Sequence, residues 1–283
     1  MENKKFGLIT EAFGHGFFAL NACQVLNLIP VAFSDKEKDD EREAHVAQIK
    51  SNFDGFVPEW GNPDEVTEEN SVNLRKELLA GHFDKDFWEK FAESTLAPAW
   101  EPDLPTFRKL DFGGYINTMF VPQKLISDGM CGTTAAQQSL PNEIFDFLVN
   151  EEYRLILGQN FNKVTDLDKV DEFLKQFPNA YIPGQNEDKK VFGIRGIAHK
   201  MYLNLYDKLD LCVGVAGTHT WYILTCFPQV PQVILYNKGG VEDWAEIAEA
   251  YRKAGYNIRA IGFDAQSDMV ELKNKILQAI AER

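Results

Sequence analysis

The segment Leu211-Cys212-Val213-Gly214-Val215-Ala216-Gly217-Thr218-His219-Thr220 decides the fold of this 283-residue chain. Its first five residues are apolar or glycine, a run with the length and composition of a strand that is buried on both faces, as in parallel sheets. Small residues follow, and hydroxyl-bearing residues then begin a helix that we predict over 218–227. A buried strand that passes through glycine into a helix is typical of βαβ units, so the segment predicts a parallel sheet.

The same alternation continues on both sides of this segment. Strand patterns recur before and after it, and each is followed by a helical pattern. The predicted strands are 115–121, 153–157, 180–182, 232–236 and 258–263, and the predicted helices are 141–149, 165–177, 195–206, 244–254 and 269–281. Six strands in about 150 residues, each followed by a helix, indicate a doubly wound sheet. Gly255 is placed where a left-handed residue would end the helix 244–254.

The N-terminal part carries a shorter version of this pattern. We predict strands at 6–10, 29–33 and 55–57 and helices at 17–26 and 41–53. The stretch 58–105 is acidic and rich in Trp, Phe and Pro, with predicted helices at 72–80 and 87–96. Its Trp and Phe residues fit a core better than a ligand-facing lid. Prolines at 98, 102 and 105 then break the chain.

Together these patterns predict an α/β protein of two Rossmann-like domains with mostly parallel, doubly wound sheets. Residues 1–108 would form the N-terminal, acceptor-side domain with an aromatic helical insertion, and residues 109–283 the C-terminal domain.

Composition excludes several function classes. The net charge is −14 and no cluster of Lys and Arg is visible, which argues against nucleic acid and anionic lipid as partners. The four cysteines show no CxxC spacing, and Cys212 and Cys226 lie in apolar runs, which fits a reducing compartment. No apolar run approaches the ~18 residues of a membrane span. We therefore expect a cytoplasmic protein without signal peptide or membrane span.

The strand-to-helix turn at Gly217 is the first candidate ligand site. Glycine lets a ligand approach the backbone, and a helix start offers N–H groups and a positive dipole end to phosphate. Thr218 and Thr220 would add hydroxyl donors, and His219 a ring N–H. The alternative is a turn and an N-cap without a ligand.

Three further residues are candidates for the same ligand. Arg195, flanked by Gly193 and Gly196, would reach a diphosphate bidentately, unless it is a solvated or structurally paired arginine. Thr133 belongs to a glycine-bearing loop that could cradle phosphates, although a surface loop explains it equally well. Gln159 follows a predicted strand and would meet a base or a ribose.

The loop between the first strand and the first helix holds two candidate proton-transfer residues. His15, between Gly14 and Gly16, would be exposed and suited to take a proton from a sugar hydroxyl near neutral pH. Glu11 would orient it or act as an independent base. The alternative is a loop histidine without a role.

Several motifs with a known chemical meaning are absent or better explained otherwise. The first strand is not followed by GxGxxG, and no GxSxG occurs, which weighs against a dinucleotide enzyme and an α/β-hydrolase. Asp84-Lys85-Asp86 and Asp166-Leu167-Asp168 match a DxD pattern, but a surface turn and a helix cap explain them better. We therefore predict no metal and no cofactor.

The stretch 115–237 resembles the C-terminal, nucleotide-sugar-binding domain of GT-B glycosyltransferases, in particular the ADP-heptose:lipopolysaccharide heptosyltransferase family. The resemblance is carried by Leu209–Gly214, Gly217–Thr220 and Pro231–Tyr236. It implies that Thr218, His219 and Thr220 meet the donor diphosphate. Gly14-His15 is similar to a Gly-His motif of other GT-B enzymes, in which the histidine activates the acceptor. The chain departs from these patterns at residues 216–221 and at Phe18, where the motif usually carries proline.

This resemblance implies a metal-independent glycosyltransferase that takes a sugar from a nucleotide-sugar donor, with a saccharide or glycolipid as the acceptor. Arg195 and the Thr218 helix start would hold the diphosphate, and His15 would act as base with Glu11 in support. Two alternatives stay open. One is a nucleotide-sugar epimerase or hydrolase on the same fold, and the other is a degenerate, non-catalytic protein that binds a ligand or a partner.

Overall fold

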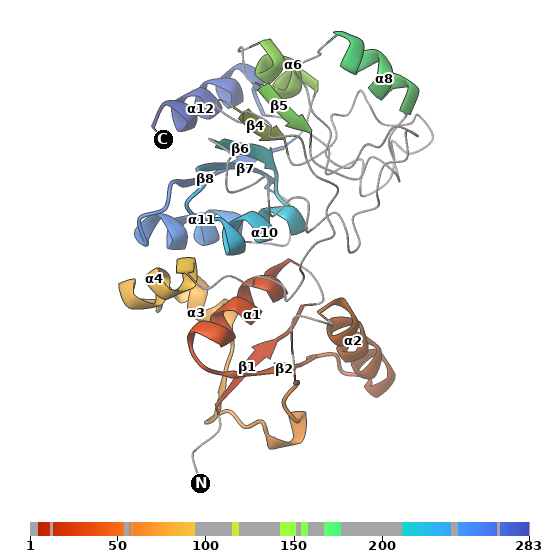
Figure 1. Ribbon diagram of the computed structural model, residues 1–283, viewed down its shortest axis with the longest axis vertical. Coiled ribbons are helices and arrows are strands. Elements are labelled where there is room, and N and C mark those ends of the chain that lie inside the picture. The colour runs from red at the N-terminus through yellow and green to blue at the C-terminus, as the bar shows by residue number, and fades with distance from the viewer. Residues whose placement is uncertain are drawn as a thin grey trace. The chain divides into compact units, whose positions relative to one another are not determined.

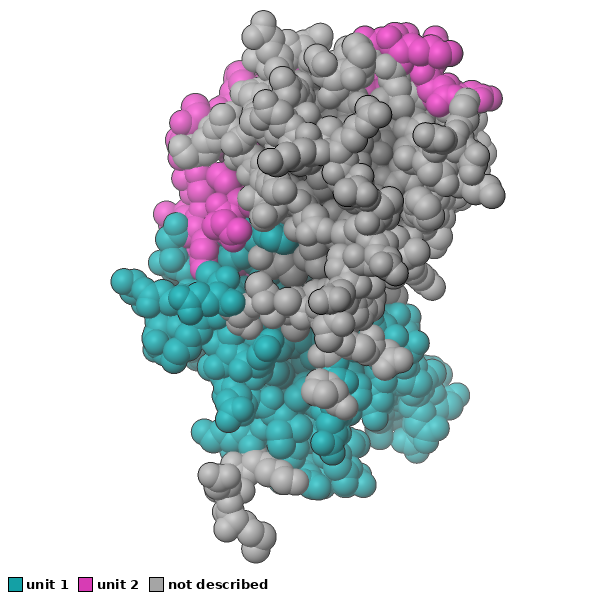
Figure 2. All heavy atoms as spheres, viewed as in Figure 1, with its two compact units in different colours: residues 1–101, 221–228, 253–255 teal, residues 102–220, 229–252, 256–283 magenta. Residues whose placement is uncertain are grey.

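The computed structural model of the chain divides by its contacts into two compact units (Figure 2). The first contains Met1–Glu101, Trp221–Pro228 and Lys253–Gly255, and the second contains Pro102–Thr220, Gln229–Arg252 and Tyr256–Arg283. The structure describes residues 5–11, 14–53, 57, 59–93, 115–118, 142–150, 154–157, 167–176, 211–238, 243–264 and 267–282. The domain boundary expected at residue 108 lies outside these residues.

The described strands of the first unit form a parallel sheet with β1 in the centre. They are β1 (Phe6–Ile9), β2 (Ile29–Ala32) and β3 (Ser71–Val72), in the order β2-β1-β3. The first two confirm the predicted strands. The short strand expected at 55–57 falls mainly outside the described residues, and the third strand that the structure describes in this sheet is β3, whose residues 71 and 72 pair with Phe6 and Gly7. Residues 54–56 themselves lie outside the description.

The helix predicted over 72–80 begins two residues later, as α3 (Leu74–Ala80). Asn73 is the physical reason, because its side chain accepts a hydrogen bond from the backbone N–H of Lys76 at 3.2 Å and so caps the helix. The strand β3 ends immediately before this cap. The remaining helical segments described in this unit are α1 (His15–Val25), α2 (Asp39–Asn52), a 3-10 turn (Pro63–Glu65) and α4 (Lys85–Glu93).

Helix α1 is the centre of the first unit's core. Its residues from His15 to Cys23 are all buried, as expected of a helix that is apolar nearly all round. It packs on β1 and contacts α3 and α4 (Figure 1). The contact with β1 is close, because a Cβ placed on Gly7 would overlap the sulfur of Cys23.

The aromatic residues after α3 belong to this core, as predicted. Phe83 and Phe87 stack at 3.9 Å between ring centroids, and Phe87, Trp88 and Phe91 are buried along α4. Phe91 lies 5.3 Å from the ring of Phe18 on α1. These rings seal α4 against α1.

The described strands of the second unit form a larger parallel sheet in the order β5-β4-β6-β7-β8 (Figure 1). All five had been predicted, two of them with these bounds. The strands are β4 (Tyr115–Thr118), β5 (Arg154–Leu157), β6 (Leu211–Val215), β7 (Gln232–Asn237) and β8 (Ile258–Phe263). Every residue of β6 is buried, Cys212 among them. The predicted strand 180–182 lies outside the described residues.

Helices accompany this sheet on both faces. They are α6 (Asn142–Asn150), α8 (Leu167–Gln176), α11 (Trp244–Lys253), α12 (Met269–Ala281) and the start of α10 (Thr218–Cys226), whose residues from Trp221 onward belong to the first unit. In Figure 1, α6 and α12 lie together on one face, and α11 lies on the opposite face. Gly255 has φ of +97°, which confirms the left-handed end predicted after α11. The predicted helix 195–206 lies outside the described part of the chain.

The described part of the chain is therefore α/β, with its strands in two parallel sheets. Within the described residues, no helix combines the length and the apolar character needed to cross a membrane.

We predict that Phe91→Ala lowers the free energy of unfolding by about 3–5 kcal/mol, because the ring is fully buried against α1. The measurement is urea denaturation followed by circular dichroism. Phe33→Ala is the matched control, since Phe33 is 36% exposed and its truncation should cost less than about 1 kcal/mol. Equal losses in the two variants would contradict the assignment of Phe91 to the core.

Candidate functional site

The sheet of the second unit has its topological switch point between β4 and β6. The chain passes from β4 to β5 on one side and later returns to place β6 on the other side. In open parallel sheets, ligands bind beyond the carboxyl ends of the strands at this point. The carboxyl end of β6 is Val215, so the turn Ala216–Gly217 and the start of α10 occupy the expected place for a ligand.

Hydrogen bonds within this turn fix its backbone. The Ala216 N–H donates to the carbonyl of Leu235 at 2.7 Å, and the Gly217 N–H donates to Thr220 Oγ1 at 3.1 Å. The Thr220 N–H donates back to the carbonyl of Gly217 at 3.0 Å. Thr220 is buried, and its hydroxyl accepts a hydrogen bond from the turn. Ligand contact by Gly217 and Thr220 stays a prediction.

The first residues of α10, Thr218 and His219, stand where the N-terminal N–H groups of the helix are available to an anion. The three remaining predicted ligand residues, Thr133, Gln159 and Arg195, lie outside the described residues. Their roles remain predictions that rest on the sequence.

The sheet of the first unit has a second switch point, between β1 and β3. The carboxyl end of β1 leads to Glu11, and β3 leads through Asn73 to Arg75 on α3. Glu11 Oε1 accepts from Arg75 Nη1 at 2.6 Å, with the two side chains 31% and 26% exposed. Arg75 carries no local sequence signal, and only the pairing of β3 with β1 brings it to this point. The described partner of Glu11 is thus Arg75, and the roles expected of Glu11, to orient His15 or to act as an independent base, stay predictions.

The predicted exposure of His15 is wrong. The residue is the first of α1 and its side chain is 1% exposed. Its ring lies edge-to-face with Trp221 at 5.2 Å and 83°, and 5.6 Å from the ring of Phe18. Neither ring nitrogen has a hydrogen-bond partner among the described residues. The glycines around His15 therefore serve close packing rather than exposure.

This environment determines the protonation state of His15. Burial, and secondarily the positive charge of Arg75, lower its pKa to about 3. The ring is neutral at physiological pH and is a weak base in this arrangement. Its assignment as the proton acceptor stays a prediction.

Gly14 contacts Trp221 directly. Its φ is +54°, and a Cβ at this position would come within 2.8 Å of Trp221 Cδ1. Only glycine combines this backbone conformation with such a close approach. Ligand contact by Gly14 stays a prediction, since its described neighbour is the indole. Both Trp221 and Gly14 belong to the first unit.

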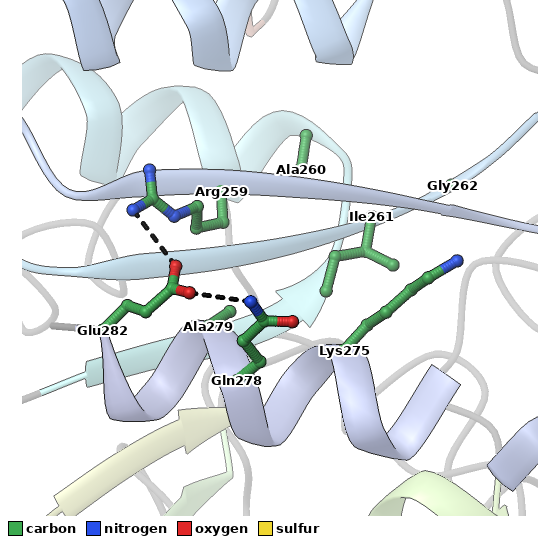
Figure 3. Close-up of a pocket in the computed structure, with 8 residues that line it drawn as sticks. All are labelled: Arg259, Ala260, Ile261, Gly262, Lys275, Gln278, Ala279 and Glu282. Carbon is green, nitrogen blue, oxygen red and sulfur yellow. Dashed lines mark hydrogen bonds and ion pairs between the residues drawn. The ribbon is translucent and has the colours of Figure 1, made fainter. Parts of the chain in front are cut away.

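The described residues also form one surface pocket of about 330 Å³, between β8 and α12 (Figure 3). Each of its charged groups has a described partner. Glu282 lies 3.5 Å from Arg259 and accepts from Gln278 at 2.8 Å, and Lys275 pairs with Glu271 at 2.6 Å. None of the predicted site residues lines it. Because β8 is the last strand in the sheet order, this pocket is remote from the switch point, and its network ties the end of α12 to β8.

The first DxD motif has a structural role. Asp84 accepts a hydrogen bond from the backbone N–H of Phe87 at 2.8 Å at the start of α4, and Asp86 pairs with Lys90 at 2.6 Å. The second motif is not described in full. Comparison of the chain with protein-family models, with curated proteins and with solved structures found no match.

We predict that stability falls on acidification because of His15. Its pKa is about 3 when folded and about 6.5 when unfolded, so below pH 6.5 the unfolded chain binds a proton that the folded chain does not. This stabilising contribution, complete at neutral pH, is lost progressively between pH 6.5 and 3. The loss by pH 5 should be about 2 kcal/mol, measured by urea denaturation at pH 7 and pH 5.

His15→Phe should reduce this loss, because phenylalanine does not titrate. His82→Gln is the control that should keep it, since His82 is exposed and bonded to Glu77. An equal pH dependence in His15→Phe and the parent would show that His15 is not the titrating group.

Proposed function

We propose that the chain is a glycosyltransferase of two Rossmann-like domains that takes a sugar from a nucleotide-sugar donor. The observation that carries this proposal is the strand order β5-β4-β6-β7-β8, with the turn from β6 into α10 at its switch point. Strand order and turn fit a phosphate-bearing ligand, because the start of α10 presents N–H groups and the positive end of the helix dipole.

In this proposal the donor diphosphate lies over the start of α10. The backbone N–H groups at Thr218 and His219 and the guanidinium of Arg195 would stabilise the negative charge that develops on the leaving diphosphate. Thr133 and Gln159 follow β4 and β5 in the sequence, and carboxyl ends of parallel strands meet at one edge, so both are assigned to the same ligand.

The reaction exchanges one bond at the anomeric carbon of the sugar. The bond to the diphosphate oxygen breaks, a bond to the acceptor oxygen forms, and the acceptor proton passes to a base. No metal or further cofactor is assigned. His15 is the proposed base, with Glu11 close to it in the sequence, although a histidine with a pKa of about 3 is poorly matched to that task.

The burial of His15 therefore favours a second candidate, a protein that binds the nucleotide sugar without turnover. In the described arrangement His15 is covered by Trp221 and Glu11 is held by Arg75, so neither side chain is presented as a base. Both candidates share the ligand and differ in the chemistry.

We predict that a nucleoside diphosphate sugar raises the midpoint of thermal unfolding. A ligand at 100 times its dissociation constant stabilises the folded state by about 2.7 kcal/mol, which a thermal-shift screen of nucleotides and nucleotide sugars detects. Arg195→Ala should lose the shift because it removes the bidentate partner of the diphosphate. The matched control Arg259→Ala, in the pocket beside β8, should keep it. No shift with any nucleotide would refute both candidates.

We predict further that a turnover measurement distinguishes the transferase from the binding protein. A transferase releases the free nucleoside diphosphate from the bound donor when an acceptor is supplied, and this release should fall at least about 100-fold in His15→Gln if His15 is the base. Release can be followed by ion-exchange chromatography. If the protein binds the nucleotide sugar but releases no nucleoside diphosphate with any saccharide or glycolipid acceptor, its function is binding alone.

A further inference from the structure

We propose that Trp221 is a positioning residue for His15: its indole covers the imidazole and separates it from water, so that His15 exchanges protons only when the indole is displaced. The assignment of a reactive role to His15 rests on the proposed function, whereas the covering of His15 by Trp221 does not. Both residues belong to the first unit.

The contact is extensive and specific. The two rings meet edge-to-face, with centroids 5.2 Å apart and planes at 83°, and each side chain is 1% exposed. Phe18 lies against both rings, at 5.6 Å from His15 and 6.2 Å from Trp221. The imidazole is thus enclosed by aromatic surface.

A histidine at this position carries a cost that an apolar side chain would avoid. Burying a polar group without a hydrogen bond costs about 1–3 kcal/mol, and within the part of the chain that the structure describes both His15 nitrogens lack a partner. The following residues, Phe17, Phe18 and Ala19, show that the same helix elsewhere fills its core with apolar side chains. A polar ring kept at such a cost points to a role in another arrangement.

Gly14 completes the arrangement. The indole approaches so closely that a Cβ on residue 14 would collide with Trp221 Cδ1 at 2.8 Å, and the φ of +54° also requires glycine. The absence of a side chain at Gly14 therefore makes room for the indole of Trp221. A side chain at position 14 should push the indole away without touching His15 itself.

Displacement of the indole would change the chemistry of His15. Water would reach the ring nitrogens, and the burial that lowers the pKa would be relieved. Among the described residues, the charged group that acts on the ring is Arg75 on α3, which is paired with Glu11 after β1. Arg75 still opposes protonation, so the pKa should rise without exceeding its ordinary value of about 6.5. A histidine in this range is a competent general base.

The test is the titration of His15 in the full chain, read from long-range 1H–15N spectra of protein with labelled histidine. In the parent, His15 should remain neutral down to pH 4. In Trp221→Ala and in Gly14→Ala its pKa should rise by about 2 units or more, while the conservative Trp221→Phe should stay close to the parent. His15→Gln identifies the signal, and circular dichroism confirms that each variant is folded. An unchanged His15 pKa in either folded variant overturns the proposal.

A second measurement keeps the proposal testable if the variants do not fold. Diethyl pyrocarbonate modifies accessible, neutral imidazoles, so in the parent His15 should react at least about ten-fold more slowly than the exposed His82. Equal rates for the two histidines in the folded parent overturn the covering of His15.

The same variants distinguish this proposal from the proposed function. If Trp221→Ala raises the pKa of His15 but no variant binds or turns over a nucleotide sugar, the covering stands and the proposed function fails. If transfer depends on His15 while its pKa is the same in the parent and in Trp221→Ala, the function stands and the covering fails.

Discussion

The burial of β6 on both faces, with hydrogen-bonded neighbours on both edges, is the constraint on which the second unit depends. Its residues 211–213 pair with β4 and its residues 212–215 pair with β7, and all five residues are buried. Such a strand has room only for apolar and small side chains. Polar side chains are therefore expected only after Val215. There, the N–H groups of Ala216 and Gly217 already donate hydrogen bonds within the fold. In the proposed function, the first turn of α10 is the place left for a ligand.

The first unit is organised around a helix rather than a strand. Helix α1 packs against β1, α3 and α4, and two polar side chains that it carries, those of His15 and Asn21, are buried with it. Asn21 meets this condition by donating to the carbonyl of Phe91 at 3.3 Å. His15 has no such hydrogen bond, and it is buried in its neutral form against aromatic rings. Asn21 is therefore a buried polar group that stabilises the core through its hydrogen bond, whereas the burial of His15 needs a different explanation.

Much of the fold was predictable because its signals are local. The bounds of β6, β8 and α12 follow from hydrophobic periodicity and from a cap such as Asp268, whose side chain accepts from the N–H groups at the start of α12. The two-residue strand β3 has no periodicity of its own. It exists because Phe6 and Gly7 offer it a partner, which is a tertiary effect.

The candidate site was less predictable because its surroundings depend on tertiary contacts. Glycines on both sides of His15 indicate an exposed loop when read locally, but Gly14 provides room for Trp221, which lies far away in the sequence. The pairing of Arg75 with Glu11 likewise depends on β3 lying beside β1. Sequence patterns place the ends of strands well, whereas they do not say which distant side chain covers them.

The fit of Gly7 against Cys23 has a consequence for the kinetics of thiol chemistry. Burial raises the pKa of the Cys23 thiol to about 12, so at neutral pH the native protein holds almost no thiolate at this position. Alkylating reagents can act on it only in molecules whose first helix has left the sheet. The rate at which Cys23 is alkylated then measures how often the core of the first unit opens, so Cys23 is an intrinsic probe of local unfolding.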